Sequence, residues 1–303
     1  MVQWIDRSEA GKLALTGPDA YGCLQALLSA DLSRVPVGGG SATALLAPRG
    51  QVRALARALR AERGWLLQCE RPALEGLFRG LWSGRVGWRV TLHKLTLQQG
   101  FVTLVGEAQE LAALLPEELA RGSEHAHAPT AVAGIPARAV RGWAGVDLIV
   151  RADRVGALIA ALTRAGATAL DAAGWDALRI AAGRIAYGAD AGERSLPAEL
   201  GLGAATVATD KGLYPGLQTV LRQQRSGTVH RCLCRLRDEH ALLAAGDELL
   251  RGDAPAGTVT SALAFDGIGL VRADAPAAGA PLVHAPTGTE VRATPLRDAA
   301  PSL

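Results

Sequence analysis

The chain of 303 residues has few cysteines, few lysines and no long apolar run. Its four cysteines are too few for a scaffold held together by disulfides. No stretch approaches the ~18 consecutive apolar residues that a membrane-spanning helix needs. The first residues, MVQWIDRSEAGKLALTG, lack the apolar core of a signal peptide. We therefore expect a protein of the reducing cytoplasm without a membrane partner.

Composition and charge describe a folded protein of more than one domain. Hydrophobic residues make up 49% and charged residues 20% of the chain, and its length exceeds what one ordinary core organises. Lysine occurs only at Lys12, Lys94 and Lys211, so almost all of the basic residues are arginine. The net charge of +3 gives little support to a nucleic-acid partner such as tRNA. We expect a monomer that does not bind nucleic acid directly.

Strand-like and helix-like segments alternate over the first two thirds of the chain, which predicts an α+β fold. A turn at 48–50 between two apolar segments indicates a hairpin. Residues 122–129 are polar and read as a surface loop. The expected strands are 12–15, 42–47, 52–59, 64–69, 88–97, 101–105 and 146–150, and the expected helices are 18–28, 72–82, 107–115, 154–165 and 171–182.

After about residue 225 the helical patterns end. Short strands are expected at 229–236, 248–250, 257–261 and 268–271, separated by Gly, Pro and Asp. Such short, evenly spaced strands are typical of a small β-barrel. The sequence thus predicts two parts, 1–224 and 225–303.

Two groups of potential metal ligands are better explained by structure. His125 and His127 lie in the polar loop, where nothing nearby completes a metal site. His230, Cys232 and Cys234 alternate on a predicted strand, so they share a face, at a spacing of ~7 Å that is too wide for one zinc ion. We expect the first pair at the surface and the second group in the barrel core. No metal site is predicted.

Two segments carry stronger signals. Residues 178–202, LRIAAGRIAYGADAGERSLPAELGL, form a long loop in which Glu199 lies among leucines. A carboxylate in such a setting either caps a helix or accepts hydrogen bonds from a ligand. Residues 210–220, DKGLYPGLQTV, combine a rare Lys, a Tyr and two Gly, with Pro215-Gly216 suiting a type II turn. Either a tight structural turn or a site for a flat anionic or heteroaromatic ligand fits this pattern.

The segment KGLYPGLQTV resembles the signature of the YgfZ family, Lys-Gly-Cys-Tyr-x-Gly-Gln-Glu-Thr-Val, which is similar to the glycine-cleavage T-protein, an aminomethyltransferase. Residues 178–202 and the opening GKLALTGPDAYGCLQALLSADL resemble matching regions of that family. The resemblance implies a ring of three domains: two intertwined ferredoxin-like α/β subdomains within 1–224, and a C-terminal β-barrel.

The resemblance also implies that tetrahydrofolate or a derivative binds near the centre of the ring. It carries the family's folate-contacting carboxylate onto Glu199 and a family Asp onto Asp31. The other matched or nearly matched positions of the expected folate site are Lys211, Gly212, Tyr214, Gly216 and Gln218.

Three departures from the family pattern affect chemistry. Leu213 replaces the signature Cys, Leu217 replaces Gln, and the uncharged Gln218 replaces Glu. The hairpin segment GQVRALARAL has no acid where a T-protein carries one. No catalytic residue can therefore be named, and aminomethyl transfer by the T-protein route is not expected.

The resemblance implies a folate-binding accessory protein for iron–sulfur cluster assembly or repair, which would contact iron–sulfur assembly or client proteins. One alternative is a folate-dependent one-carbon transferase, which requires a proton-handling group near the folate; the candidates for it are Asp31, Asp190, Glu199 and Lys211. The other is an interaction protein whose folate pocket has decayed. Whether the protein is an enzyme is left open by the sequence.

Overall fold

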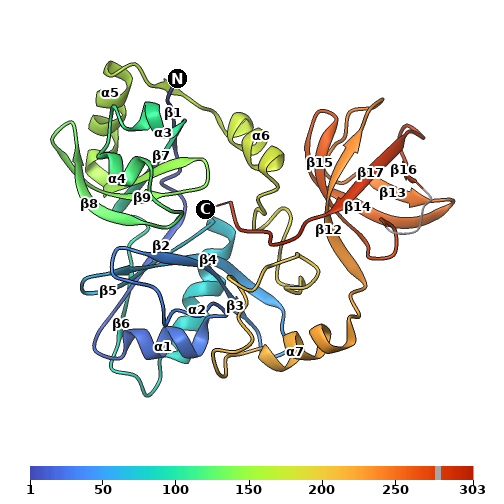
Figure 1. Ribbon diagram of the computed structural model, residues 1–303, viewed down its shortest axis with the longest axis horizontal. Helices are drawn as coiled ribbons and strands as arrows, with labels where there is room; N and C mark the ends of the chain where they lie inside the picture. The colour runs from blue at the N-terminus through green and yellow to red at the C-terminus, as the bar shows by residue number, and fades with distance from the viewer. Residues whose placement is uncertain (277–280, 303) are drawn as a thin grey trace.

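The computed structural model describes residues 1–276 and 281–302, which form three lobes arranged around a common centre (Figure 1). Two lobes are each built on an open sheet covered by helices, and the third is a closed six-stranded β-barrel. The predicted α+β fold with a C-terminal barrel is therefore confirmed.

The first lobe contains a five-stranded antiparallel sheet in the order β3-β4-β5-β2-β6. Helices α1 and α2 pack on this sheet, and a 3₁₀ turn at Arg71–Ala73 leads into α2. The elements are β2 (Gly11–Thr16), α1 (Ala20–Leu27), β3 (Gly40–Leu46), β4 (Val52–Ala61), β5 (Gly64–Cys69), α2 (Leu74–Gly84) and β6 (Thr91–Lys94).

The second lobe contains a six-stranded sheet in the order β11-β1-β7-β10-β9-β8. Only the short β11 pairs in parallel, with β1. Its strands are β1 (Gln3–Asp6), β7 (Gln99–Val105), β8 (His127–Val132), β9 (Ile135–Arg141), β10 (Gly145–Arg151) and β11 (Thr168–Ala169); its helices are α3 (Ala108–Leu111), α4 (Glu117–Ala120) and α5 (Val155–Arg164), the last preceded by a 3₁₀ turn at Ala152–Arg154.

The barrel closes in the order β12-β15-β14-β13-β16-β17. Helix α6 (Ala172–Ala182) packs on its strands β14 and β15, and α7 (Leu217–Ser226) leads into it. The barrel strands are β12 (Arg231–Asp238), β13 (Glu248–Arg251), β14 (Ala254–Leu263), β15 (Asp266–Arg272), β16 (Leu282–His284) and β17 (Glu290–Pro295).

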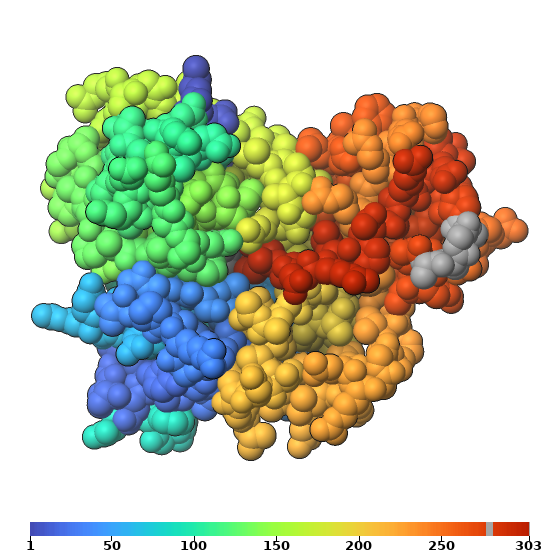
Figure 2. Space-filling view, viewed as in Figure 1, coloured from blue at the N-terminus to red at the C-terminus, as the bar shows by residue number. Residues whose placement is uncertain are grey.

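The chain crosses between the lobes several times. Strand β1 belongs to the second lobe, β2 to β6 belong to the first, and β7 returns to the second. After β17 the last described residues run back between the three lobes (Figure 2). There the backbone N–H of Ser302 donates to the carbonyl of Ile185 at 2.9 Å.

Where local signals were strong, the predicted elements are confirmed. The 48–50 hairpin forms, and helix α6 begins at Asp171, whose side chain accepts a hydrogen bond from the Gly174 N–H at 2.8 Å, and ends at the left-handed Gly183. The sequence reading missed β1, β8, β9, α7 and the last two barrel strands. It also drew one helix over 107–115, where α3 ends at Leu111 and α4 follows Pro116.

The prediction of His125 and His127 as surface residues was wrong for His127, whereas His125 lies half-buried in a turn. His127 begins β8 and is only 4% exposed. Its backbone N–H donates to the Gly38 carbonyl of the first lobe at 2.7 Å. Burial lowers the pKa of both imidazoles to about 4, with nearby Arg57 and Arg138 adding to the effect. A locally polar segment was thus buried by the neighbouring lobe.

Candidate functional site

The 210–220 segment forms the loop that leads into α7. Gly216 has φ +85° and ψ −9°, and the Leu217 N–H donates to the Tyr214 carbonyl at 3.3 Å. These are the features of the predicted type II turn, whose third position needs a positive φ. A Cβ atom on Gly216 would lie 2.7 Å from the carbonyl oxygen of Ala47, so the turn also requires glycine for space.

Lys211 closes the C-terminal end of α1. Its Nζ donates to the carbonyl oxygens of Gln25, Leu28 and Ala30 at 2.7, 2.5 and 2.8 Å. Burial lowers the pKa of the ammonium to about 8, while the charge of Asp31 opposes this effect. The three acceptors take up all three ammonium protons, so Lys211 fastens the loop to α1.

Tyr214 and Asp31 lie beside Lys211, as the resemblance implies, but their polar atoms are also used within the chain. The Tyr214 hydroxyl donates to the Ala208 carbonyl at 2.7 Å, and burial raises its pKa to about 12. The Asp31 carboxylate accepts the Ser33 N–H at 3.0 Å, and this hydrogen bond is the main cause that lowers the pKa of Asp31. The structure thus brings Asp31, Lys211 and Tyr214 together.

Glu199 joins its own segment, residues 178–202, to the barrel. Its side chain accepts the Leu196 N–H at 3.0 Å and Nε of Arg231 at 3.1 Å. Its carbonyl oxygen accepts the Leu233 N–H of β12 at 2.7 Å. With 5% of its surface exposed, Glu199 caps its own turn and anchors the barrel, which is one of the two roles that the sequence left open.

Three further positions of the expected folate site differ in exposure. Gly212, with φ +99°, and Gln218 on α7 are exposed, whereas Gly216 is buried. Leu213, at the signature cysteine position, is 83% exposed. Among the cavities along the described residues are five of about 360–500 Å³, and neither Glu199 nor Tyr214 lines any of these five. Folate contacts by these side chains remain a prediction.

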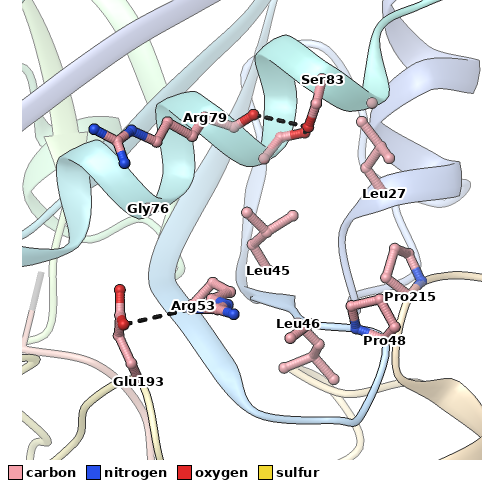
Figure 3. A pocket seen from close by; sticks show the side chains of 13 residues that line it. Leu27, Leu45, Leu46, Pro48, Arg53, Gly76, Arg79, Ser83, Glu193 and Pro215 are labelled. Carbon is pink, nitrogen blue, oxygen red and sulfur yellow. Dashed lines mark hydrogen bonds and ion pairs between the residues drawn. The ribbon is translucent and has the colours of Figure 1, made fainter.

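One apolar cavity of about 430 Å³ joins the segments that carry the resemblance; we call it the hairpin cavity (Figure 3). It lies between α1, α2, the β3–β4 hairpin and the loop before α7. Arg53 of the hairpin lies 3.4 Å from Glu193 of the 178–202 segment (Figure 3). The walls are formed by Leu27, Leu45, Leu46, Ala47, Pro48, Arg53, Gly76, Arg79, Gly80, Ser83, Gly84, Glu193 and Pro215.

The polar side chains of the hairpin cavity have partners within the chain. Its single acid, Glu193, faces Arg53, and Ser83 donates its hydroxyl to the Arg79 carbonyl at 2.9 Å. Neither side chain is placed beside a general base of the kind that a nucleophile needs. Sequence reasoning missed this cavity because its walls are mostly ordinary apolar residues from separate parts of the chain.

A second, polar cavity of about 460 Å³ opens near the centre of the molecule. Arg7 lines it with its guanidinium carbon 4.1 Å from the Trp175 ring centre. Its Nη2 donates to the Ser302 carbonyl at 3.4 Å, while Nη1 has no partner among residues 1–276 and 281–302. Burial raises the pKa of Glu70, which accepts hydrogen bonds from the Tyr187 N–H and the Ser302 hydroxyl. No local pattern in the sequence marked these residues.

Within the described ranges, no three His, Cys, Asp or Glu side chains are grouped so that they could hold a metal ion. Over the same part of the chain, no helix is long and apolar enough to span a membrane.

Comparison with known proteins agrees with this architecture. The family of the GCVT N-terminal domain matches residues 1–211, and the CAF17 C-terminal beta-barrel domain matches residues 230–299. An aminomethyltransferase of Rubrobacter xylanophilus is 26% identical over 264 residues, which are 85% of this chain and 71% of that protein. The crystal structure of the glycine cleavage system aminomethyltransferase T from Bartonella henselae has a TM-score of 0.85 at 19% identity, covering 98% of this chain and 86% of that one.

The fold is thus that of the aminomethyltransferases with a barrel as the third lobe. Because the GCVT N-terminal domain covers more than half of its residues, the chain belongs to the GCVT family.

Proposed function

We propose that the protein binds tetrahydrofolate or a derivative in the hairpin cavity and serves as an accessory protein of the YgfZ type in iron–sulfur cluster assembly or repair. The observation that carries this proposal is the convergence of three sequence segments on one cavity. Leu27 comes from the opening segment, Glu193 from 178–202 and Pro215 from 210–220.

The chemistry of the cavity suits a reduced folate. The faces of the pterin and benzoyl rings can pack between the leucine and proline side chains of the walls, while the amino, oxo and ring N–H groups on the edge of the pterin need the polar groups that the walls also carry. The glutamyl carboxylates would compete with Glu193 for Arg53 and with Glu75 for Arg79, since each guanidinium group can bind a carboxylate through two hydrogen bonds. The volume of about 430 Å³ lies within the usual range of small-molecule sites.

The absence of catalytic groups at the aligned positions favours an accessory role. Arg53 lies in the hairpin where a T-protein carries an acid, so the site presents a cation where a proton-handling carboxylate would be needed. The exposed Leu213 has no thiol with which to react. The C-terminal match to the CAF17 barrel supports an accessory role of the YgfZ type rather than a catalytic role.

Calorimetric titration with 5-formyltetrahydrofolate tests the binding site. We expect saturable binding that weakens about tenfold or more, which is ~1.4 kcal/mol, in Arg53→Glu and in Arg79→Glu. Arg151→Glu is the matched control, since Arg151 is an exposed arginine that is likewise paired with a nearby acid. Heat of binding that is unaffected by all three substitutions would remove the hairpin cavity as the site, and no heat at all would favour a decayed pocket.

The second candidate, a one-carbon transferase, is favoured by the similarity to aminomethyltransferases along most of the chain. Turnover with tetrahydrofolate and a formaldehyde-equivalent donor distinguishes the two. We expect intact folate binding without turnover. The cellular role is tested in a strain that lacks the protein: activity of a dehydratase containing a [4Fe–4S] cluster should fall and be restored by the wild-type chain but not by Arg53→Glu.

A further inference from the structure

Cys232 and Cys234 form a close pair of thiols on β12. Two residues along a strand span ~6.6 Å, yet the two Sγ atoms lie only 3.6 Å apart because both side chains lean toward each other on the inner face of the barrel. No such pairing was expected from the sequence, where the spacing alone suggested separate core residues. The short distance sets these sulfurs apart from the other two cysteines.

The two thiols differ in access. Cys234 is fully buried and is flanked on both sides, by Gly269 of β15 and Pro295 of β17. Cys232 is partly exposed and lies two residues beyond the last β12–β17 pair, with only Val271 of β15 opposite it. A hydrogen bond between the two thiols lowers the pKa of Cys232 and raises that of Cys234. One thiol is therefore reachable and the other shielded behind it.

We propose that Cys232 and Cys234 are a redox-active dithiol that is oxidised by low-molecular-weight disulfides such as oxidised glutathione. The Cys232 thiolate attacks one sulfur of the small disulfide, its S–S bond breaks, and one small thiolate leaves as a mixed disulfide forms. Cys234 then attacks the Cys232 sulfur, its proton passes to the departing small thiolate, and the second small thiol leaves. In sum, two protein thiols become one disulfide and one small disulfide becomes two thiols.

A disulfide explains the pair better than a metal does. A structural zinc site needs four ligands, and two sulfurs supply half of them. His230 lies exposed just outside β12, and within the described ranges no third ligand joins the pair. By contrast, a partly exposed thiol next to a buried resolving thiol is the arrangement that thiol–disulfide exchange uses.

Oxidation would reach beyond the barrel because Leu233 lies between the two cysteines. Its N–H donates to the Glu199 carbonyl at 2.7 Å, and its own carbonyl accepts the Leu296 N–H at 2.9 Å. A disulfide bridges Cα atoms that are usually 4.4–6.8 Å apart, so the ~6.6 Å span on a strand lies at the upper end of that range. Drawing the two residues together puckers β12 at Leu233 and loosens the contact with Glu199.

Mass spectrometry tests the proposal on the full chain after incubation with oxidised glutathione. Trypsin cleaves after Arg231 and Arg235 and releases both cysteines in one peptide of residues 232–235. We expect this peptide to become about 2 Da lighter, reversibly with dithiothreitol, while Cys23 and Cys69 stay reduced because both are fully buried.

Two variants separate a dithiol from ordinary core packing. Cys234→Ser should stop at the mixed disulfide on Cys232, and Cys232→Ser should leave residue 234 unmodified. Cys23→Ser is the control and should oxidise like the wild type. The proposal is overturned if the wild-type peptide keeps its mass, or if Cys23 and Cys69 react as fast as the pair.

The effect on Glu199 is measured by amide hydrogen exchange, which does not depend on folate. Exchange at Leu233 should rise about tenfold or more in the oxidised form, and unchanged exchange would refute the coupling. The relevance to folate rests on the proposed function, since Glu193 of the hairpin cavity lies on the same segment as Glu199. If oxidation proceeds as expected but no form of the protein binds 5-formyltetrahydrofolate, the proposed function fails and the dithiol stands.

Discussion

The ion pair between Arg57 and Asp147 is the sharpest place to test how the first two lobes are held together. Arg57 lies on β4 of the first sheet and Asp147 on β10 of the second. Nη2 of Arg57 donates to Oδ2 of Asp147 at 2.6 Å, and neither side chain is exposed by more than 3%. Thr103 donates its hydroxyl to the other carboxylate oxygen at 2.6 Å, and Arg57 also donates to Gln68.

Removing one partner should cost more than removing both. Asp147→Ala leaves the guanidinium of Arg57 buried without its counter-charge, and Arg57→Met leaves the carboxylate in the same state. Each single substitution is expected to lower the free energy of unfolding by about 3–5 kcal/mol. The double variant leaves no unpaired buried charge. Apart from the packing cost of the smaller side chains, its free energy of unfolding should therefore fall by about 2 kcal/mol or less.

Urea denaturation, followed by far-ultraviolet circular dichroism, measures the three free energies of unfolding in a double-mutant cycle. Arg272→Met is a suitable control, since Arg272 is an exposed arginine whose pairing with Asp274 should contribute less than about 1 kcal/mol. Single variants that lose less than about 1 kcal/mol, or a double variant whose loss equals the sum of the single losses, would refute a buried, coupled pair.

Three further predictions concern buried polar groups and the signature turn. Arg138 donates to Nδ1 of His127 at 2.8 Å, and burial lowers the pKa of His127 from 6.5 to about 4, so the unfolded state binds the proton first as the pH falls. The contribution of His127 to stability should be complete above pH 6.5 and fall toward pH 4. In denaturation titrations, His127→Gln should reduce the slope of the unfolding free energy against pH by up to about 1.4 kcal/mol per pH unit. Lys211→Met removes three charge-assisted hydrogen bonds and should lower the free energy of unfolding by about 2–4 kcal/mol at pH 7. Because burial lowers the pKa of Lys211 from 10.5 to about 8, the wild type should gain stability relative to the variant as the pH rises from 8 to 10.5. A loss of relative stability over this range would contradict the lowered pKa. Gly216→Ala should lower the free energy of unfolding measured in urea by about 2 kcal/mol or more, because a positive φ and the nearby Ala47 carbonyl both oppose a Cβ atom. The control Gly212→Ala, with a positive φ but open space around it, should lose about 1–2 kcal/mol. Equal losses would contradict the steric argument.

The elements that could be predicted are those whose signals are local. The hairpin at 48–50, the capped helix α6 and the type II turn at Gly216 each depend on a few neighbouring residues and on backbone angles that those residues favour. The missed strands β8 and β9 carry weak local patterns, and they form because β8 pairs with β9 and β9 pairs with β10. The family resemblance also lies in short contiguous segments, which is why it was readable without a structure.

The role of each polar side chain could not be predicted in the same way. Nothing local indicated that Lys211 donates to carbonyl oxygens at and just after the C-terminal end of α1, more than 180 residues away in the sequence, or that Glu199 accepts from Arg231 of the barrel; their folate contacts stay a prediction. His127 was expected at the surface and is buried by the first lobe.

The sequence by itself therefore determined the fold class, the barrel, the signature turn and the loss of the signature thiol at Leu213. Only the tertiary structure decided which polar groups are already partnered, where a cavity opens beside Arg53, and that Cys232 and Cys234 lie in contact. The physical reason is that periodicity and turn geometry are local properties of the chain, whereas burial and hydrogen-bond partners depend on residues brought together by folding.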